Sequence, residues 1–448
     1  MAATLRFVGH AGYCVERGEV SLAVDPWLSG PAFDNGWDLL MPSAPLDSAR
    51  ITHLWFSHEH PDHFSIGAVK AIPEARRPEV TVLFQRTADG RVASFLRKQG
   101  FGKVIEVAGG EKVELGPGLW LTTSMARDGD SCHLLAADGF RMINFNDCFF
   151  SSMAEVEGAM KALGVKAGEV DFVATQFSYA NWMGNPGEPG RRQEFARLKL
   201  LHLDLEVKAV QPRYVMPFAS YVYFSHQENA YLNDSVNRTA AVVQRIRALG
   251  VAPVVCRPGD SLELSGDGLK AASAEAEARA EELDAHVDAV QRGEKPLRRS
   301  DAVPLEDLLA TVRAGLERLR QGMAAVDFAL MRIRMRRAAF EVTDHKAVVV
   351  VESLRKVRVE PEGTPADVAL SSEALRFAFQ QDFGFDTLLV NGRFLERRLR
   401  GVETVMTLCG QFGYLRRKQS LVKSILRRRL YDAPRLALER ARNRALPN

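Results

Sequence analysis

The sequence has few cysteines, and none of them lies in a spacing that is typical of metal binding or of a disulfide framework. Only five occur among 448 residues, at positions 14, 132, 148, 256 and 409. They are far apart and odd in number, which argues against a disulfide scaffold and against a cysteine-based zinc or iron–sulfur site. A reducing compartment is the default environment for such a chain, and we therefore expect a cytoplasmic protein.

Long hydrophobic runs are also missing. No uninterrupted apolar stretch approaches the roughly 18 residues that a membrane span needs, so we expect none. Met1 is followed by Ala-Ala-Thr and a strand-like run, which is unlike a secretory signal. The net charge of +3 gives no indication of a polyanionic partner, and we expect no nucleic-acid binding.

What the sequence does contain is typical of a globular protein with more than one domain. Hydrophobic residues make up 46% and charged residues 26% of a chain that is long for a single core. Short apolar runs alternate with turns as far as about residue 265, and an Ala- and Glu-rich stretch follows. We expect a first domain over 1–265, a helical linker over 266–335 and a small α+β domain over 336–448. The last stretch, from 415 on, has eleven Arg or Lys against two acidic residues. It is interpreted as a solvated surface or tail, and an acidic partner is the alternative.

The first domain is expected to be a layered α/β sandwich, because it has many strand-like runs and fewer helices. The expected strands include runs at 5–8, 22–24, 51–56, 80–84, 119–121, 133–136, 141–145, 171–175 and 214–217. The expected helices lie around 66–73, 91–99, 151–163, 191–210 and 235–249, with a further long helix over 303–335.

The most informative segment follows the apolar run 51–56. His58, His60, Asp62 and His63 form an H-x-H-x-D-H cluster at the point where a strand enters a turn. Imidazoles and a carboxylate packed this closely can converge on metal ions. The spacing can serve two metal centres, with His58 and His60 at one and Asp62 and His63 at its neighbour.

A dinuclear site also needs a bridging carboxylate and donors from other strands. Asp147 follows the strand-like run 141–145 and is the expected bridge, although it could instead cap a turn. Asp25 also ends a strand and could orient a ligand imidazole without touching metal. His133 and His226 are the candidates for the remaining ligands, and a hydrogen-bonded core histidine is the alternative for each.

Other residues are open alternatives around the same site. Asp128 or Asp130 could replace His133, and His10 could approach the metals from the end of the first strand. Asp62 and Asp147 are the expected catalytic carboxylates. Arg213 and Tyr221 are the expected substrate-binding residues, because a basic and an aromatic group suit an anionic or sugar-like ligand; ordinary surface charge and packing are the alternative.

At this point the chain resembles a known family. His58, His60, Asp62, His63 and Asp147 resemble the signature of the metallo-β-lactamase superfamily, and the chain is most similar to the metallo-β-lactamase domain of CMP-N-acetylneuraminate hydroxylases. The resemblance covers most of 4–265 and runs through 24–33, 56–65, 146–148, 179–190, 211–221 and 257–260. It implies a metallo-β-lactamase αββα sandwich, here with a C-terminal helical and α+β extension.

The sequence departs from this pattern in two respects. The Rieske iron–sulfur module of those hydroxylases has no counterpart here, so oxygen chemistry would need electrons from a separate protein or from the substrate. The usual third histidine of the first metal is also missing, and Phe218-Ala219 stand where a final histidine is usual; His226 could take that place. A site richer in oxygen donors favours harder metals, so iron or manganese becomes as plausible as zinc.

Three functions are compatible with the sequence. We favour a dinuclear, iron-dependent oxygenase or hydroxylase that acts on a polar, sugar-like or amino-acid-like small molecule, with a possible electron-transfer partner. A metal-dependent hydrolase of a lactone, ester or phosphodiester is the alternative. A binding protein that kept the fold without catalysis is the third, and the five retained ligand residues argue against it.

Overall fold

A computed structural model of the chain describes residues 2–126, 129–323, 337–399 and 401–417. The chain divides into two compact units, 1–298 and 299–448. None of the helices in these described ranges has the length and apolarity that a bilayer span requires. The end of the helix expected over 303–335 and most of the basic segment from 415 on lie outside the described residues.

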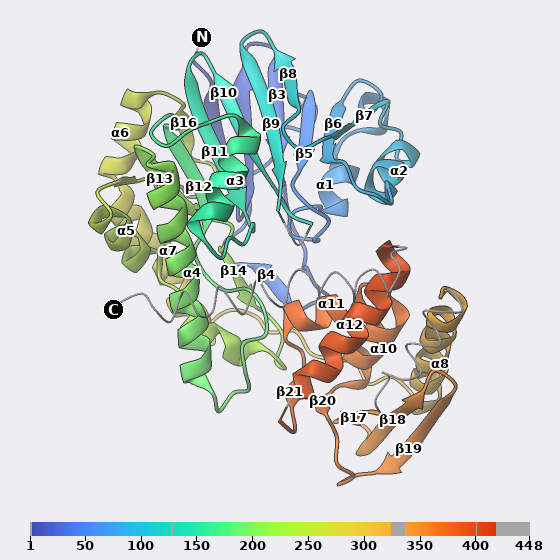
Figure 1. Cartoon of the computed structure of the whole chain (residues 1–448). Helices are drawn as coiled ribbons and strands as arrows, with labels where there is room; N and C mark the ends of the chain where they lie inside the picture. The colour runs from blue at the N-terminus through green and yellow to red at the C-terminus, as the bar shows by residue number, and fades with distance from the viewer. Residues whose placement is uncertain (1, 127–128, 324–336, 400, 418–448) are drawn as a thin grey trace. The chain divides into compact units, whose positions relative to one another are not determined.

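The first unit contains two seven-stranded mixed sheets (Figure 1). In spatial order, the first sheet consists of β16 (Ser261–Glu263), β1 (Thr4–Gly9), β2 (Gly12–Arg17), β3 (Val20–Val24), β5 (His53–Phe56), β6 (Thr81–Gln85) and β7 (Lys103–Val107). The second consists of β15 (Ala252–Pro253), β13 (Tyr214–Phe218), β12 (Phe172–Gln176), β11 (Phe140–Asn146), β10 (Ser131–Ala137), β9 (Leu119–Met125) and β8 (Lys112–Gly116). A small separate pair is formed by β4 (Trp37–Leu39) and β14 (Val222–Phe224).

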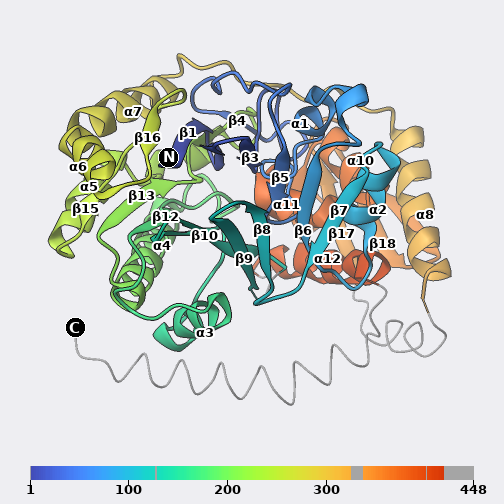
Figure 2. The same ribbon diagram turned by 90° about the horizontal axis from the view of Figure 1, so that it is seen from above.

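Helices cover the outer faces of both sheets. α1 (Ile66–Ala71) and α2 (Arg91–Lys98) pack on the first sheet, where Val69 and Leu96 join a core with Leu54 and Phe56. α3 (Met153–Leu163), α4 (Pro189–Val210) and α5 (Thr239–Ala248) accompany the second sheet, and Figure 2 shows α3 outside β9. α6 (Gly266–Ala274), α7 (Ala276–Gln291) and the short 3-10 helices η1 (Glu74–Arg76) and η2 (Ala230–Ser235) complete the unit.

The largest core lies between the two sheets. Phe7 and Trp55 from the first sheet and Leu121, Ile143 and Val173 from the second belong to one buried cluster. β5 is buried on both faces. Successive side chains of a strand point to opposite faces, and Trp55 joins the core between the sheets, whereas Leu54 and Phe56 join the core under α1 and α2. This arrangement confirms the expected αββα sandwich of the metallo-β-lactamase type.

Parallel pairing determines where polar side chains can gather. β3, β5 and β6 run parallel to one another, as do β11, β12 and β13. The carboxyl ends of neighbouring parallel strands meet at one edge of a sheet, and the residues that follow them lie close together. Asp25, Ser57, Asp147 and Ala219 each follow directly after such an end, and Gln176 is the last residue of its strand.

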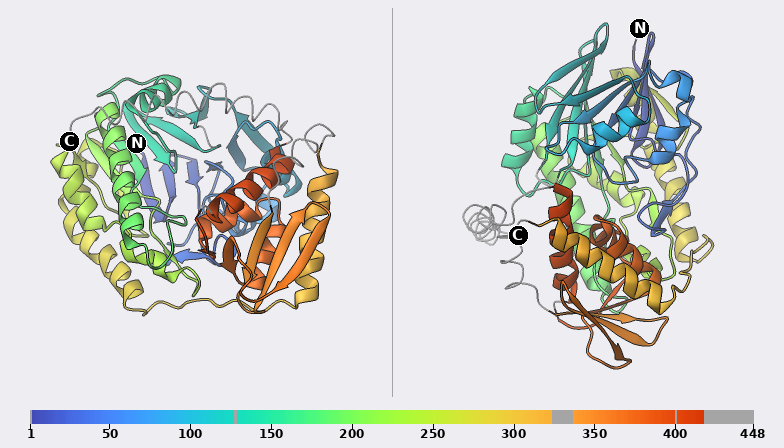
Figure 3. Two further views of the ribbon diagram at one scale, coloured as in Figure 1. Left: turned by 60° about the horizontal axis from the view of Figure 1, so that its bottom comes forward. Right: turned by 90° about the vertical axis from the view of Figure 1, so that its right-hand side faces the viewer.

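The second unit has its own sheet and helices (Figure 3). The sheet order is β19 (Lys356–Pro361), β18 (Ala347–Ser353), β17 (Ala338–Val342), β20 (Val368–Leu370) and β21 (Leu395–Glu396). The helices are α8 (Leu305–Gln321), α10 (Ser372–Gln380), α11 (Gly384–Asn391) and α12 (Gly401–Arg417). Phe340 of β17 contacts Phe379 and Phe385 at ring-centroid distances of 5.9 and 6.4 Å, so the sheet and the helices share a core.

Candidate metal centre

The turn after β5 gathers four of the predicted ligands. Backbone hydrogen bonds from the amides of His63 and Phe64 to the carbonyl of His60, at 3.0 and 2.7 Å, close this turn. Ser65 then caps α1 by accepting a hydrogen bond from the amide of Ala68. The turn is therefore held at both ends, and its side chains are presented from a rigid segment.

Asp25 holds the imidazole of His63 through the Nδ1 atom of that ring. Its Oδ2 lies 2.8 Å from Nδ1 of His63, and it also accepts a hydrogen bond of 2.6 Å from the hydroxyl of Ser57. The backbone amide of Ser57 donates to the other oxygen at 2.8 Å. Nδ1 of His63 is thus occupied and Nε2 faces the other candidate ligands. The prediction that Asp25 orients an imidazole is confirmed by these contacts.

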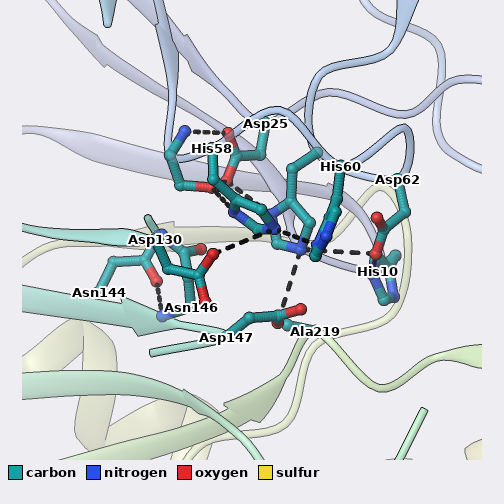
Figure 4. A network of polar contacts seen from close by, with 12 residues as sticks. His10, Asp25, His58, His60, Asp62, Asp130, Asn144, Asn146, Asp147 and Ala219 are labelled. Carbon is teal, nitrogen blue, oxygen red and sulfur yellow. Dashed lines mark hydrogen bonds and ion pairs between the residues drawn. The ribbon is translucent and has the colours of Figure 1, made fainter. Parts of the chain in front are cut away.

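Two groups of donors lie side by side at the turn (Figure 4). In one group, Nε2 of His58 lies 2.9 Å from Nδ1 of His60 and 3.8 Å from a carboxylate oxygen of Asp130. In the other, Oδ2 of Asp62 lies 3.1 Å from Nε2 of His10 and 3.5 Å from Nε2 of His63. Two nitrogens bound to one ion at about 2.1 Å each lie roughly 3 to 3.5 Å apart, so both groups are close to the spacing that a metal needs.

Asp147 connects the two groups. It comes from the second sheet, directly after β11, and its Oδ1 lies 3.5 Å from Nε2 of His63. A third group of possible ligand atoms consists of His58, His63 and Asp147, and it takes one imidazole from each of the other two groups. Asp147 therefore lies within reach of ligand atoms from both groups.

The charges at the site also fit a cation. Burial alone would lower the pKa of His63, but the carboxylates of Asp62, Asp147 and Asp25 raise that pKa well above its usual range. Burial raises the pKa of Asp147 and Asp62, yet the neighbouring basic groups, His63 first among them, more than offset this, and both pKa values are lowered. The site thus holds ionised carboxylates that attract positive charge.

The first group carries the neutral imidazole that metal binding requires. Burial, together with the positive charges of His63 and His60, lowers the pKa of His58 to about 3. In addition, Oδ1 of Asp62 and Nε2 of His63 are buried and make no hydrogen bond to any described residue. Buried polar atoms without partners are costly, so these two atoms are compatible with metal ligation.

Backbone strain gathers at the same place. His10, Asp25, Asn146 and Ala219 all have positive φ, of 48°, 39°, 51° and 53°. Residues other than glycine rarely adopt this conformation, and strain of this kind persists at sites where the surrounding structure enforces it. Here it directs His10 and the segment before Asp147 toward the turn.

Two histidines that we predicted as ligands lie elsewhere. His133 is buried in β10, where Nε2 lies 2.9 Å from the hydroxyl of Tyr13 and the ring packs on Trp55 at 4.2 Å. His226 is also buried, and its Nδ1 accepts a hydrogen bond of 3.2 Å from the amide of Glu228. Neither belongs to a group of converging ligand atoms in the described parts of the chain.

The predicted substrate-binding residues are also apart from the donors. Arg213 precedes β13 and its side chain is 77% exposed, whereas the candidate metal centre lies beyond the opposite end of that strand. Tyr221 is buried, and its hydroxyl donates a hydrogen bond of 3.0 Å to the carbonyl of Pro217. Its polar group is therefore satisfied inside the fold.

His10 and Asp130 complete the observed groups, and the sequence presented both only as open alternatives. His10 lies in the turn between β1 and β2, and Asp130 lies just before β10. Asp128, the other alternative, lies outside the described residues. The signal that could have favoured Asp130 is its place just before a strand whose neighbour, β11, ends just before Asp147.

Known proteins with similar sequences match more than half of the chain. No protein-family model matches it. Cytidine monophosphate-N-acetylneuraminic acid hydroxylase from Danio rerio is 25% identical over 58% of this chain and 46% of its own length. The Mus musculus protein of the same name is 28% identical over 52% and 41%. The chain thus spans less than half the length of these curated relatives.

Among solved structures, CmlA from Streptomyces venezuelae, a diiron β-hydroxylase, is 16% identical over 58% of this chain and 54% of its own, with a TM-score of 0.41. A TM-score and an identity this low support no conclusion about this chain. The facing sheets and the H-x-H-x-D-H turn give the first unit a metallo-β-lactamase fold, to which a helical and α+β extension is added, and in sequence the chain is similar to the hydroxylases named above.

Proposed function

We propose that the chain is a dinuclear metal-dependent enzyme. The observation that carries this proposal is the shared position of Asp147 between two groups of donors, each of which contains at least two buried or half-buried ligand residues. His58, His60 and Asp130 would hold one ion, and His10, Asp62 and His63 would hold the other. Asp147 would contribute to both.

The reaction that we favour is iron-dependent hydroxylation of a polar, sugar-like or amino-acid-like small molecule. Two considerations support it: the sequence relatives are named as hydroxylases, and three carboxylates in the donor set favour hard metals such as iron. A bound pair of irons would supply the redox chemistry that hydroxylation by dioxygen requires. Electrons would come from a separate electron-transfer protein or from the substrate.

The residues of the chain have definite tasks in this reaction. Asp25 and Ser57 hold the ring of His63 in one orientation, which keeps Nε2 directed at the metals. The side chains of Asp147 and Asp130 are 19% and 15% exposed, so the site is accessible at their side. His58 and His63 line the buried side and exclude water there.

Hydrolysis is the second candidate. The same donor set could hold two zinc ions that lower the pKa of a bound water, which would then attack a lactone, ester or phosphodiester. The observation in its favour is that two adjacent sites with a shared carboxylate suit this chemistry without any electron donor. Manganese is compatible with either reaction.

The test is elemental analysis and optical spectroscopy of protein purified without added metal, together with turnover assays. We expect about two irons per chain, with absorption from a coupled iron pair. Two zincs with esterase or phosphodiesterase turnover would favour hydrolysis instead.

Asp147→Asn and His60→Ala should lose metal and activity together. The exposed Asp301→Asn is the matched control and should retain both. Full metal content in Asp147→Asn would contradict the proposal.

A further inference from the structure

The side chain of Gln176 uses all of its hydrogen-bonding groups at the edge of the candidate metal centre. It is the last residue of β12 and is 8% exposed. Its Nε2 donates to Oδ1 of Asp147 at 3.0 Å and to the backbone carbonyl of Ala219 at 3.3 Å. Its Oε1 accepts a hydrogen bond from Nζ of Lys199 on α4.

Lys199 determines which way this amide points. If the amide were reversed, its oxygen would face two acceptors, the Asp147 carboxylate and the Ala219 carbonyl, and its NH2 group would face an ammonium group. With Lys199 in place, only the observed orientation satisfies every group. Without Lys199, the preference for that orientation would be weaker, and the carboxylate of Asp147 could lose its donor.

The contact with Ala219 connects both sides of the site. The amide of Ala219 donates a hydrogen bond of 2.9 Å to the carbonyl of His10, in the turn between β1 and β2 of the first sheet. Ala219 and His10 both have positive φ, so each is held in a conformation that it would not adopt alone. Gln176 therefore contacts the proposed shared ligand directly and a second proposed ligand through one backbone segment.

The acidic neighbours of Lys199 favour an ammonium group. Lys199 is half-buried on α4 and lies within electrostatic reach of the carboxyl groups of Asp147, Glu206 and Asp130. A half-buried ammonium group loses hydration, and these acidic groups together with the acceptor Oε1 of Gln176 partly offset that loss. Lys199 is thus held where it can donate its hydrogen bond to Gln176.

We propose that Gln176 and Lys199 are positioning residues of the metal centre: Lys199 orients the amide of Gln176, and Gln176 holds the carboxylate of Asp147 and the segment that supports His10. This inference rests on the proposed function, because it assumes that Asp147 and His10 bind metal. It assigns an action through Asp147 to two residues that do not themselves touch the ions.

The test measures metal affinity in the full chain. Zn²⁺ is titrated into metal-free protein in competition with a chromogenic chelator, for wild type, Gln176→Leu, Lys199→Met, the double variant and Lys199→Arg. Loss of groups that orient metal ligands typically weakens metal binding about 10- to 100-fold, and we expect Gln176→Leu and Lys199→Met to fall in this range. Lys208→Met is the matched control, because Lys208 is exposed in the last turn of the same helix, and it should bind like wild type.

The double variant separates a shared action from two independent ones. If Lys199 acts through Gln176, the double variant should bind Zn²⁺ no more weakly than Gln176→Leu alone, and Lys199→Arg should recover most of the affinity. Melting temperatures of the metal-free variants should stay close to that of wild type. Three results would overturn the inference even if wild type binds Zn²⁺. They are wild-type affinity in Lys199→Met, additive losses of affinity in the double variant, and losses of affinity that parallel a lower melting temperature. No Zn²⁺ binding by wild type would overturn the proposed function and this inference with it.

Discussion

At the scale of single residues, sequence spacing predicts those ligands that are close in the chain. His58, His60, Asp62 and His63 lie within six positions, and a turn brings their side chains together whatever the rest of the fold does. His10 meets this turn because β1 and β5 belong to the same sheet, and Asp130 meets it because β10 belongs to the facing sheet. That pairing depends on long-range contacts, which spacing along the chain does not contain.

His133 shows that sequence spacing can also suggest a ligand that the fold places away from the other ligands. Its position 14 residues before Asp147 made it a candidate, but Nε2 is hydrogen-bonded to Tyr13, which also accepts a hydrogen bond of 3.2 Å from Asn144. Asp130, three residues earlier, precedes the strand and is partly exposed beside His58. A buried imidazole with a satisfied partner and a ligand imidazole have the same sequence signature.

The first prediction compares the two histidines. We expect His10→Ala to lose about one of two bound ions, because it removes the imidazole that lies 3.1 Å from Asp62. His133→Gln should retain both ions, since His133 contacts none of the candidate ligands. Elemental analysis of both purified variants measures this directly. The reverse result, with metal lost only in His133→Gln, would exclude the assignment of the second group.

The second prediction concerns the pH dependence of stability in metal-free protein. Burial lowers the pKa of His133 to about 3 in the folded chain, whereas an unfolded histidine titrates near 6.5. Below pH 6.5 the unfolded state therefore binds a proton that the folded state does not, and stability falls by up to about 1.4 kcal/mol per pH unit until pH approaches 3.

His133→Gln should remove this contribution. Urea unfolding of metal-free protein at several pH values between 6.5 and 4.5 should show a shallower decline in the free energy of unfolding for the variant than for wild type. His58 titrates in the same direction but is present in both proteins, so its contribution cancels. Parallel curves for the two proteins would show that His133 is protonated equally in both states.

At the scale of elements, local periodicity predicts most of the helices and strands. The helices expected around 66–73, 91–99, 151–163, 191–210 and 235–249 correspond to α1, α2, α3, α4 and α5, with ends that differ by a few residues. The order of strands in the sheets is not local. β3 pairs with β5, while β4 pairs with β14 far along the chain, and such pairing depends on which faces are buried together.

The third prediction uses a carboxyl group on α4. Glu206 is 2% exposed and accepts a hydrogen bond from the hydroxyl of Thr175. Burial raises its pKa to about 8, which is well above the value near 4.3 of an unfolded glutamate. Between these values the unfolded state releases a proton that the folded state keeps, so this residue lowers stability as pH rises.

Glu206→Gln should therefore stabilise the protein more at pH 8 than at pH 5, by on the order of 1–3 kcal/mol. The glutamine carbonyl can accept the same hydrogen bond from Thr175, so the neutral contact is kept. Urea unfolding at the two pH values measures the effect, and Glu194→Gln on the exposed face of the same helix is the control. Equal shifts at both pH values would mean that Glu206 is ionised in the fold.

At the scale of the whole molecule, the division of the chain into units is difficult to predict, because a helix face made of small residues is not recognised as buried from the sequence. The Ala- and Glu-rich segment after 265 has the composition of a solvated helical linker. In the structure its helices α6 and α7 belong to the first unit, where Leu269, Ala276, Ala280 and Leu283 are part of the main core. Alanine contributes little to a hydrophobic pattern, yet it lets a helix pack closely.

The last prediction follows from the position of the metal centre within one unit. All of its candidate ligands lie between residues 10 and 147, and metal that binds only the folded state stabilises the structure that holds it. At a free metal concentration of about 100 times the dissociation constant, the gain is about 2.7 kcal/mol, which slows amide exchange through unfolding roughly 100-fold. We therefore expect metal to slow hydrogen exchange in peptides from β11 and to leave peptides from β18, an equally buried strand of the second unit, unchanged. Mass spectrometry with and without chelator measures both strands in one sample. Equal slowing in both strands would mean that the two units unfold together, and no slowing in β11 would mean that the centre does not bind the added metal.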